Sequence, residues 1–405
     1  MYQDLTKRFE DEKARQYIQG LRTGFSRRLF DEVRPRGLLT LVEAVSVVKG
    51  VLECLSEVDF SFQKMEPGHG KGHLIRDYVN ALLLFSHLKA DQKQVFIGFI
   101  AGVLHDIGCA VVQRYEERSR VIRHAEAAAI LLHYVFEEVG EKLGLNREEK
   151  FLIEYCVAAH THYTRDFEVE TSTGEKVVIQ PYVDTDDQGP IWAVWFTRWV
   201  DRLDCNGPSY FVRHFLSLSF ENEHYEYAQS GFFQVDFDAH MVIDPADPTT
   251  FVGHMKMFAD SQTNDSVYGR NDFGRMVKLR DEYREMMYSV ITAIQDVSKL
   301  ERPIFKNIKH HLEKLEPMIR CTTVADGLIE RLRGLPTETR DGWVNGFLVM
   351  MQVYHLWFHT YVVPLLINLP DFFKSLPGIS EDICGDLRGD LRGDLNYKLI
   401  KIENL

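Results

Sequence analysis

The sequence predicts a mainly α-helical protein, in which a helical bundle carries a β-hairpin insertion and is followed by a helical C-terminal region. Two observations indicate this fold class. The run from Val95 to Leu104 is hydrophobic on every face, which suits a helix buried at the centre of a domain. Polar and apolar residues alternate around a glycine turn between Phe167 and Val183, which is typical of a hairpin.

The N-terminal part of the chain, residues 1–58, alternates charged and apolar residues at helical spacing. A break at Pro35-Arg36-Gly37 divides it into two or three amphipathic helices. A glycine-rich loop from Glu66 to His73 follows. The apolar spacing from Leu74 to Leu88 predicts the next helix, with His73 on its first turn.

Three further helices follow the central one. His124 begins a helix whose alanines allow close approach to a neighbour, and Glu148 to His160 forms the next. Ile191 to Asp204 carries tryptophans at intervals of three and four, which we interpret as core packing. Asp201 lies off that stripe with Asp204 one turn on, so the two carboxylates share a side of the helix.

The segment between the last two of these helices holds the predicted hairpin and then an acidic loop, residues 184–189. This loop is interpreted either as a lid or as an exposed decoration. From about residue 216 the character changes, and Met276 to Leu300, Lys306 to Ile319 and Thr323 to Arg333 predict helices.

The stretch from Phe347 to Leu369 lacks Asp, Glu, Lys and Arg and is long enough to span a bilayer. Gln352, His355 and His359 share one face of it, which favours a buried helix and no membrane contact. The tail repeats a four-residue unit and is interpreted as low-complexity. The predicted divisions are an N-terminal helical segment (1–58), the helical bundle (59–215), a mostly helical C-terminal domain (216–383) and the tail (384–405).

Composition indicates an ordinary globular protein with a small-molecule partner. The 405 residues are 45% hydrophobic and 26% charged. A net charge of −13 argues against nucleic acid and anionic lipid as partners. It is compatible with a homo-oligomer. Six scattered cysteines fit neither a zinc ribbon nor a disulfide framework. With a charged N-terminus that lacks a signal peptide, these features predict a cytoplasmic protein.

His105 and Asp106 end the central apolar run. Burying an uncompensated polar group costs roughly 2–7 kcal/mol, and a charge costs more. A bound metal would satisfy both side chains, because a carboxylate can bridge two ions while the adjacent imidazole binds one of them. The pair therefore predicts a metal centre.

The ordered set of candidate ligands is His73, His105-Asp106, His124, His160 and Asp201. Together with His-x-x-Arg at His73 to Arg76 and Asp-Arg-Leu-Asp at Asp201 to Asp204, it resembles the HD superfamily of metal-dependent phosphohydrolases over roughly residues 60–215. The resemblance implies an HD-type helical bundle. It also implies a phosphomonoesterase or phosphodiesterase that acts on a nucleotide or a related small phosphate through a metal-activated water.

The resemblance also implies how metals are held. The first ion would be bound by His73, His105, Asp106 and Asp201. In members with two metals the second would be bound by Asp106, His124 and His160. Imidazole and carboxylate ligands of this kind are compatible with one or two ions. They are also compatible with Mn, Fe, Ni, Co, Zn or Mg as the element.

One departure from the family concerns the phosphate contact. Several two-metal members carry a lysine three residues after the HD aspartate, where this chain has Cys109. Candidates to replace it are Lys71, Arg76, His69 and His162. The residues assigned to catalysis are thus Asp106, Arg76, Lys71 and His69, and those assigned to substrate are Lys71, Arg76, His162 and Asp204.

Two other functions stay open. Diiron oxygenases that resemble this superfamily use the same ligand types to activate O₂. A non-catalytic member would only sense a metabolite, but the complete ligand set argues against it. Between the first two, the frequency of hydrolases in the superfamily favours hydrolysis.

Overall fold

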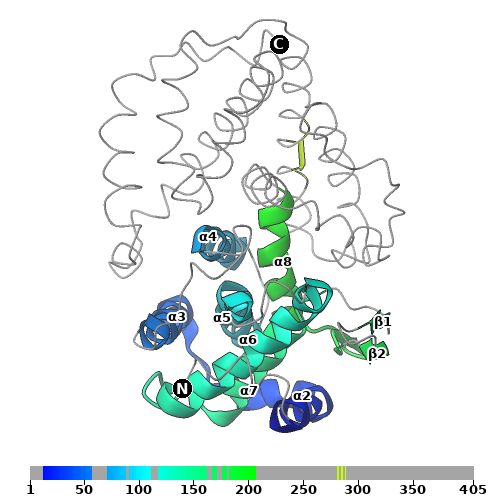
Figure 1. Ribbon diagram of the computed structural model, residues 1–405. Helices are drawn as coiled ribbons and strands as arrows, with labels where there is room; N and C mark the ends of the chain where they lie inside the picture. Colours follow the sequence, from blue (N-terminus) through cyan, green and yellow to red (C-terminus); the bar gives the residue numbers. More distant parts are fainter. Residues whose placement is uncertain are drawn as a thin grey trace, which may run out of the picture. The chain divides into compact units, whose positions relative to one another are not determined.

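The computed structural model describes residues 12–56, 71–87, 91–110, 117–161, 167–170, 176–179 and 182–206, and four residues between 281 and 288. The chain divides into two units, residues 1–205 with 263–280 and residues 206–262 with 281–405. The elements of the first unit are drawn in colour in Figure 1.

The described residues of the first unit are mostly helical, which confirms the mainly α prediction. The helices are α2 (Glu12–Gly24), α3 (Thr40–Ser56), α4 (Lys71–His87), α5 (Gln92–Leu104), α6 (Glu117–Val139), α7 (Arg147–Ala158) and α8 (Trp192–Asn206), with short 3₁₀ turns η2 (Arg27–Glu32), η3 (Gly37–Leu39) and η6 (Ile107–Ala110). β1 (Phe167–Glu170) pairs with β2 (Lys176–Ile179) in an antiparallel hairpin, as predicted. Two very short strands, β3 (Thr185–Asp186) and β4 (Gly189–Pro190), form a second pair.

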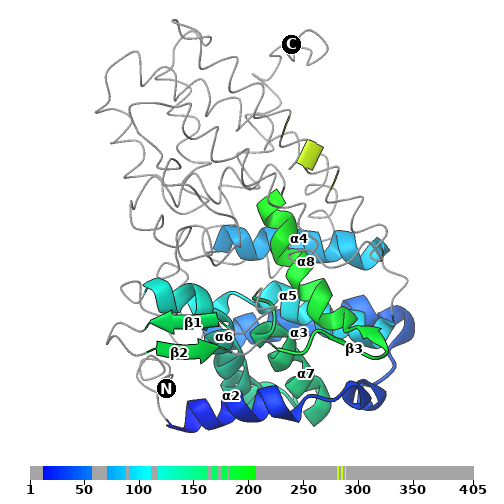
Figure 2. The same ribbon diagram turned by 90° about the vertical axis from the view of Figure 1, so that its right-hand side faces the viewer.

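Helix α5 lies at the centre of this unit, as its sequence predicts. It packs against α3, α4 and α7, and every residue from Gln94 to Leu104 is buried (Figure 2). The side chain of Asp91 caps its start by accepting a hydrogen bond from the backbone N–H of Lys93. Each large apolar side chain buried here contributes roughly 1.5–3 kcal/mol, so the position of this helix is strongly specified.

Among the described residues, one segment is long and apolar enough to cross a membrane by length and composition alone. It is Gln92–Ala110, which comprises α5 and η6, and 89% of its most apolar window is buried inside the protein. Core helices of globular proteins meet the same criterion, so this segment is weak evidence for a span.

Helix α8 lies against α5 at two glycines. A Cβ atom on Gly98 would lie 2.9 Å from Cβ of Phe196, and one on Gly102 would lie 3.0 Å from a methyl group of Val200. This close approach brings the C-terminal half of α8 beside the end of α5. Trp195 and Trp199 are buried, which confirms that the tryptophan stripe is core packing.

The N-terminal segment packs on α6 and α7. Arg22 in α2 forms an ion pair with Glu126 in α6 at 2.5 Å, and Tyr17 donates a hydrogen bond to Glu154 in α7 at 2.7 Å. The predicted break between the first helices is present, and Gly37 lies within it at a φ of 57°. This left-handed conformation is one that glycine adopts without strain.

The acidic loop is held from two sides. Arg198 of α8 binds the carboxylate of Asp184 at 2.5 Å, and Trp195 donates to the backbone carbonyl of the same aspartate at 3.0 Å. Arg27 of η2 binds Asp186 at 2.7 Å. These contacts join the loop to the framework, which argues against both the lid and the purely decorative interpretation.

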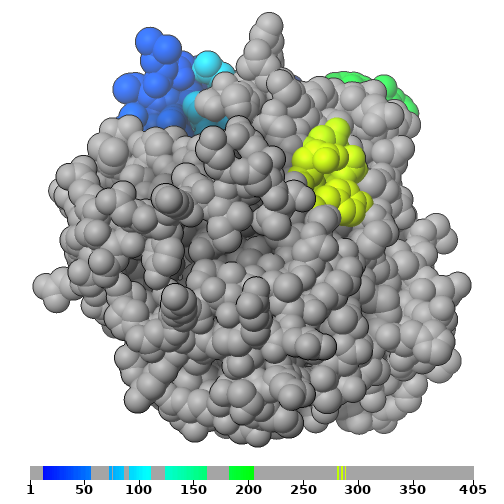
Figure 3. Space-filling model, turned by 90° about the horizontal axis from the view of Figure 1, so that it is seen from above, coloured from blue at the N-terminus to red at the C-terminus, as the bar shows by residue number. Residues whose placement is uncertain are grey.

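Most C-terminal predictions fall on residues outside the described set. These include the apolar stretch 347–369, the low-complexity tail 384–405 and the boundaries at 215 and 383, which stay predictions. Within 207–405, Asp281, Arg284, Glu285 and Tyr288 are described, and all four are helical. They fall inside the helix predicted from Met276 to Leu300 and are visible as the yellow-green surface in Figure 3.

Candidate metal centre

The structure brings all six predicted ligands together. His73 comes from α4, His105 and Asp106 from the turn after α5, His124 from α6, His160 from the turn after α7, and Asp201 from α8. Five segments far apart in the sequence therefore meet at the end of the central helix.

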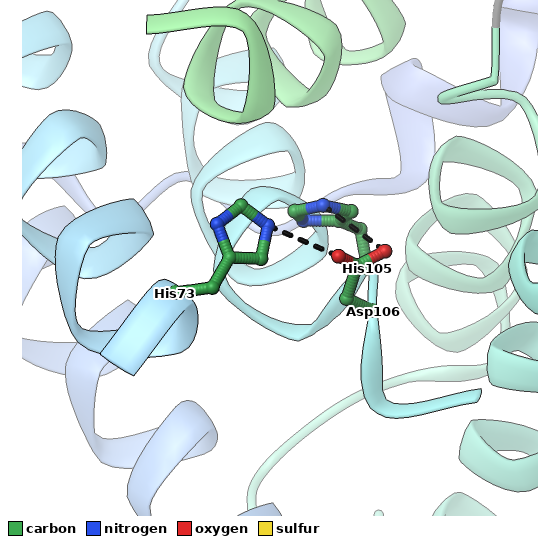
Figure 4. Close-up of side chains that lie close together, drawn as sticks. All are labelled: His73, His105 and Asp106. Atoms are coloured by element: carbon green, nitrogen blue, oxygen red, sulfur yellow. Dashed lines mark ion pairs between the residues drawn. The ribbon is translucent and has the colours of Figure 1, made fainter. Parts of the chain in front are cut away.

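The carboxylate of Asp106 lies at the middle of this group. Its Oδ2 atom is 3.0 Å from Nε2 of His73, and Oδ1 is 3.3 Å from Nε2 of His105. Figure 4 shows the two imidazole rings directed at this carboxylate. On the other side, Oδ1 is 3.3 Å from Nε2 of His124 and 3.8 Å from Nε2 of His160.

Two overlapping groups result, and Asp106 belongs to both. His73, His105 and Asp106 form one set of closely spaced ligand atoms, and Asp106, His124 and His160 form the other. Asp201 joins the first set, since its Oδ1 atom is 3.7 Å from Nε2 of both His73 and His105. These buried groups have the residue types and spacing to hold a metal ion.

Hydrogen bonds at the far side of each ring determine which nitrogen faces the centre. Nδ1 of His105 donates to the carbonyl of Gly102 at 2.7 Å, and Nδ1 of His160 donates to the carbonyl of Val157 at 2.6 Å. A carbonyl only accepts, so in each neutral ring Nε2 carries a lone pair. This second contact is the arrangement by which proteins orient metal-binding histidines.

A lone pair that faces a carboxylate is unfavourable without a cation between them. Nε2 of His105 is buried and has no hydrogen-bond partner among the described residues. Nε2 of His160 faces Nε2 of His124 at 3.0 Å. A metal ion would bind the lone pair of His105 and the nitrogens that converge beside it, so the donor set fits one.

The pKa values of His105 and His160 are shifted by the same crowding of buried polar groups. Burial lowers the pKa of His105, but the carboxylates of Asp106, Asp201 and Asp77 outweigh this and raise it well above its usual value. Burial, together with the neighbouring His105 and His124, lowers the pKa of His160 well below its usual value. The two shifts differ in direction because carboxylates surround His105, whereas His160 faces two other imidazoles.

Gly108 explains how α6 comes close enough to Asp106. A Cβ atom at this position would lie 2.1 Å from the carbonyl oxygen of His124 and 2.4 Å from the backbone nitrogen of Ala128. The alanines predicted to allow close packing here, Ala125 and Ala127 to Ala129, are all buried. The backbone of α6 therefore rests directly on the turn that carries Asp106.

Gly108→Ala is expected to push α6 away from this turn. We expect a loss of about 1–3 kcal/mol or more in the free energy of unfolding, as for other overpacked sites, and weaker metal binding by the group that contains His124. Urea denaturation and metal titration measure the two effects. Gly20→Ala in α2 is the control, because a Cβ there meets nothing within 4 Å; it should gain about 0.5–1 kcal/mol. If both variants behave alike, α6 does not depend on Gly108.

Arg76 and Asp204 form a buried pair. Arg76 donates from Nε to Oδ1 of Asp204 at 2.7 Å and from Nη2 to Oδ2 at 3.0 Å. Asp204 also accepts a hydrogen bond from Nδ1 of His73 at 2.6 Å. Burial raises the pKa of Asp204, but Arg76 and His73 together hold it well below its usual range, so the carboxylate stays charged.

This geometry gives a further role to two residues that are predicted to contact the substrate. Both were assigned to substrate, but the side chains of Arg76 and Asp204 are 4% and 0% exposed and bind each other. The pair orients the ring of His73, so we describe both as positioning residues. The sequence shows the helical face of Arg76 but not that a carboxylate from α8 would cover it.

Asp77 was missed by the sequence reasoning. It lies one helical turn after His73, is 1% exposed, and has its Oδ2 atom 3.0 Å from Nε2 of His73. Arg202 was also missed, and its Nε atom lies 3.9 Å from Oδ2 of Asp201. The four-residue spacing between His73 and Asp77 is the signal that could have found the aspartate.

Several predicted substrate residues stay untested. His69 and His162 lie outside the described residues. Lys71 begins α4, but its side chain is outside the described set. Cys109, at the position where two-metal family members carry lysine, is buried.

Comparisons of the chain with protein-family models, with curated proteins and with solved structures find no match. The case for a function therefore depends on the geometry of the centre.

Proposed function

We propose that this protein is a metal-dependent phosphohydrolase of the HD superfamily that hydrolyses a small phosphate ester, such as a nucleotide. One observation carries the proposal. The Nε2 atoms of four histidines from four segments converge on the carboxylate of Asp106, at 3.0 to 3.8 Å. A structural core does not need this convergence, whereas residues that would hold metal ions do.

The donor set supports two ions. The first would be held by His73, His105, Asp106 and Asp201, and the second by Asp106, His124 and His160. Bound ions of this kind polarise a phosphoryl oxygen and lower the pKa of water.

The residues of the chain prepare the site before any ion binds. Backbone carbonyls fix the rings of His105 and His160, and the Arg76–Asp204 pair fixes that of His73. A preorganised centre of this kind needs little rearrangement when charge develops during the reaction.

Charge explains why the substrate would depend on the ions. The described residues around the centre include four carboxylates, those of Asp77, Asp106, Asp201 and Asp204. They include two guanidinium groups, that of Arg76 beside Asp204 and that of Arg202 near Asp201. The carboxylates outnumber the guanidinium groups, so the described side chains offer a phosphate ester no net positive charge. Cations bound at the centre reverse this balance.

One observation favours the second candidate, an oxygenase that holds iron with the same ligands. Arg76, the cation that sequence reasoning placed on the phosphate, is bound to Asp204. An unphosphorylated substrate would not need a phosphate-binding cation.

The two functions are separated by one experiment on the full chain purified without chelator. We expect metal in the protein and phosphate release from nucleotides or from nitrophenyl phosphate esters, with no oxygen uptake. Chelation should abolish the release, and adding back divalent metal should restore it. A protein that contains iron, consumes O₂ with an unphosphorylated substrate and leaves every phosphate ester intact would be an oxygenase.

A further inference from the structure

Asp77 is a buried carboxylate at the edge of the metal centre. Its side chain is 1% exposed, and neither of its oxygens accepts a hydrogen bond from the part of the chain that the structure describes. Its Oδ2 atom lies 3.0 Å from Nε2 of His73 and 3.9 Å from Nδ1 of His105. A buried carboxylate without a donor is costly, and either a proton or a cation beside it removes that cost.

The neighbouring side chains direct their donors elsewhere. The guanidinium of Arg76, the preceding residue, binds Asp204 through Nε and Nη2. Nδ1 of His105 donates to the carbonyl of Gly102, and Nδ1 of His73 donates to Asp204. In neutral His73 the nitrogen that faces Asp77 therefore carries a lone pair, so a proton or a cation must lie between it and the Asp77 oxygen 3.0 Å away.

His73 links Asp77 to the proposed ligands. The same Nε2 atom lies 3.0 Å from an oxygen of Asp77 and 3.0 Å from an oxygen of Asp106. His73, Asp77 and Asp204 also each offer a ligand atom within 4.8 Å of the others, a spacing suited to a metal ion. Since Asp204 is engaged by Arg76, Asp77 is the carboxylate of this trio that binds no guanidinium group among the described residues.

We propose that Asp77 is a further ligand of the first metal ion, an inference that rests on the proposed metal centre. The ion would then meet three carboxylates, from Asp77, Asp106 and Asp201, and two imidazoles, from His73 and His105. The second ion would meet two imidazoles and one carboxylate. Oxygen-rich sets suit Mn²⁺, and imidazole suits Zn²⁺, so the two positions would differ in preference.

The test is Asp77→Asn in the full chain, followed by calorimetric titration of the chelated protein with Mn²⁺ and, separately, with Zn²⁺. We expect one equivalent of Mn²⁺ to bind at least about 10-fold more weakly, the lower limit for loss of a supporting residue at a metal site. Zn²⁺ should be affected less, so the preference for Mn²⁺ over Zn²⁺ falls. The Asp77→Ala variant also removes the asparagine oxygen, which can itself bind metal. Its Mn²⁺ affinity should fall by at least as much as that of Asp77→Asn.

Stability separates a ligand from a structural residue. Without metal, Asp77→Asn should melt at the same temperature as the unmodified protein or higher, because the substitution removes a buried carboxylate that lacks a donor. With Mn²⁺ present it should melt lower than the unmodified protein. Glu154→Gln is the matched control, since Glu154 is also buried but hydrogen bonds to Tyr17 away from the centre. It should bind both metals normally.

The outcomes distinguish this inference from the proposal on which it rests. If the unmodified protein binds neither metal, the metal centre and the proposed function both fail. If it binds metal and the Asp77 variants keep the same Mn²⁺ affinity and the same preference, Asp77 is not a ligand. A variant that melts lower without metal, and loses Mn²⁺ and Zn²⁺ equally, would show a purely structural role and overturn the inference.

Discussion

Asp106→Ala is expected to remove both metal ions and to reduce phosphate ester hydrolysis to background. Asp106 is the described residue that belongs to both ligand groups, with oxygens 3.0 Å from Nε2 of His73 and 3.3 Å from Nε2 of His124. Without it, the imidazoles on the two sides lose the shared negative charge that would hold two cations close together. Elemental analysis of the purified variant measures the metal directly.

His124→Ala is the control for this prediction. It removes a ligand of the second group and leaves His73, His105, Asp106 and Asp201 in place, so the metal content should fall towards one equivalent. Circular dichroism of each variant establishes that the helices are intact. An Asp106→Ala protein that keeps two equivalents of metal and full turnover would show that the centre is elsewhere.

Arg76→Ala is expected to destabilise the protein by about 3–5 kcal/mol, the usual cost of removing one partner of a buried ion pair. The loss leaves the carboxylate of Asp204, which is 0% exposed, without its guanidinium partner. Since Asp204 also orients the ring of His73, metal affinity should fall as well. Urea denaturation of metal-free protein measures the stability, and metal titration measures the affinity.

Two other arginine variants show whether burial is the cause. Arg76→Lys keeps the charge but not the paired hydrogen bonds, so it should be intermediate. Arg22→Ala breaks the pair with Glu126, whose side chains are 15% and 17% exposed, and should cost less. The opposite result is informative: if Arg76→Ala keeps full stability and metal but loses about 10²-fold in turnover, Arg76 acts on the substrate, as the sequence reasoning assigned.

Much of the fold was predictable because the relevant signals are local. The run from Val95 to Leu104 has no polar face, and a helix of this kind must be surrounded on all sides, as α5 is. The hairpin of β1 and β2 follows from alternation around a glycine turn. The six proposed ligands were also selected from the sequence, because their order resembles the ligand pattern of the HD superfamily, which can be compared without knowing how the helices pack.

The partners of individual charges were decided by the tertiary structure. Arg76 and Asp204 each have a clear helical position in the sequence, but only the packing of α4 against α8 brings the guanidinium onto the carboxylate. The tertiary structure also decides that Asp77, one turn after His73 on α4, is buried, and the contact of α6 with Gly108 sets the distance from His124 to Asp106. Periodicity determines which face of a helix a residue occupies. Which charged group it contacts there depends on long-range packing, because the sequence pattern of one helix holds no information about a segment more than a hundred residues away.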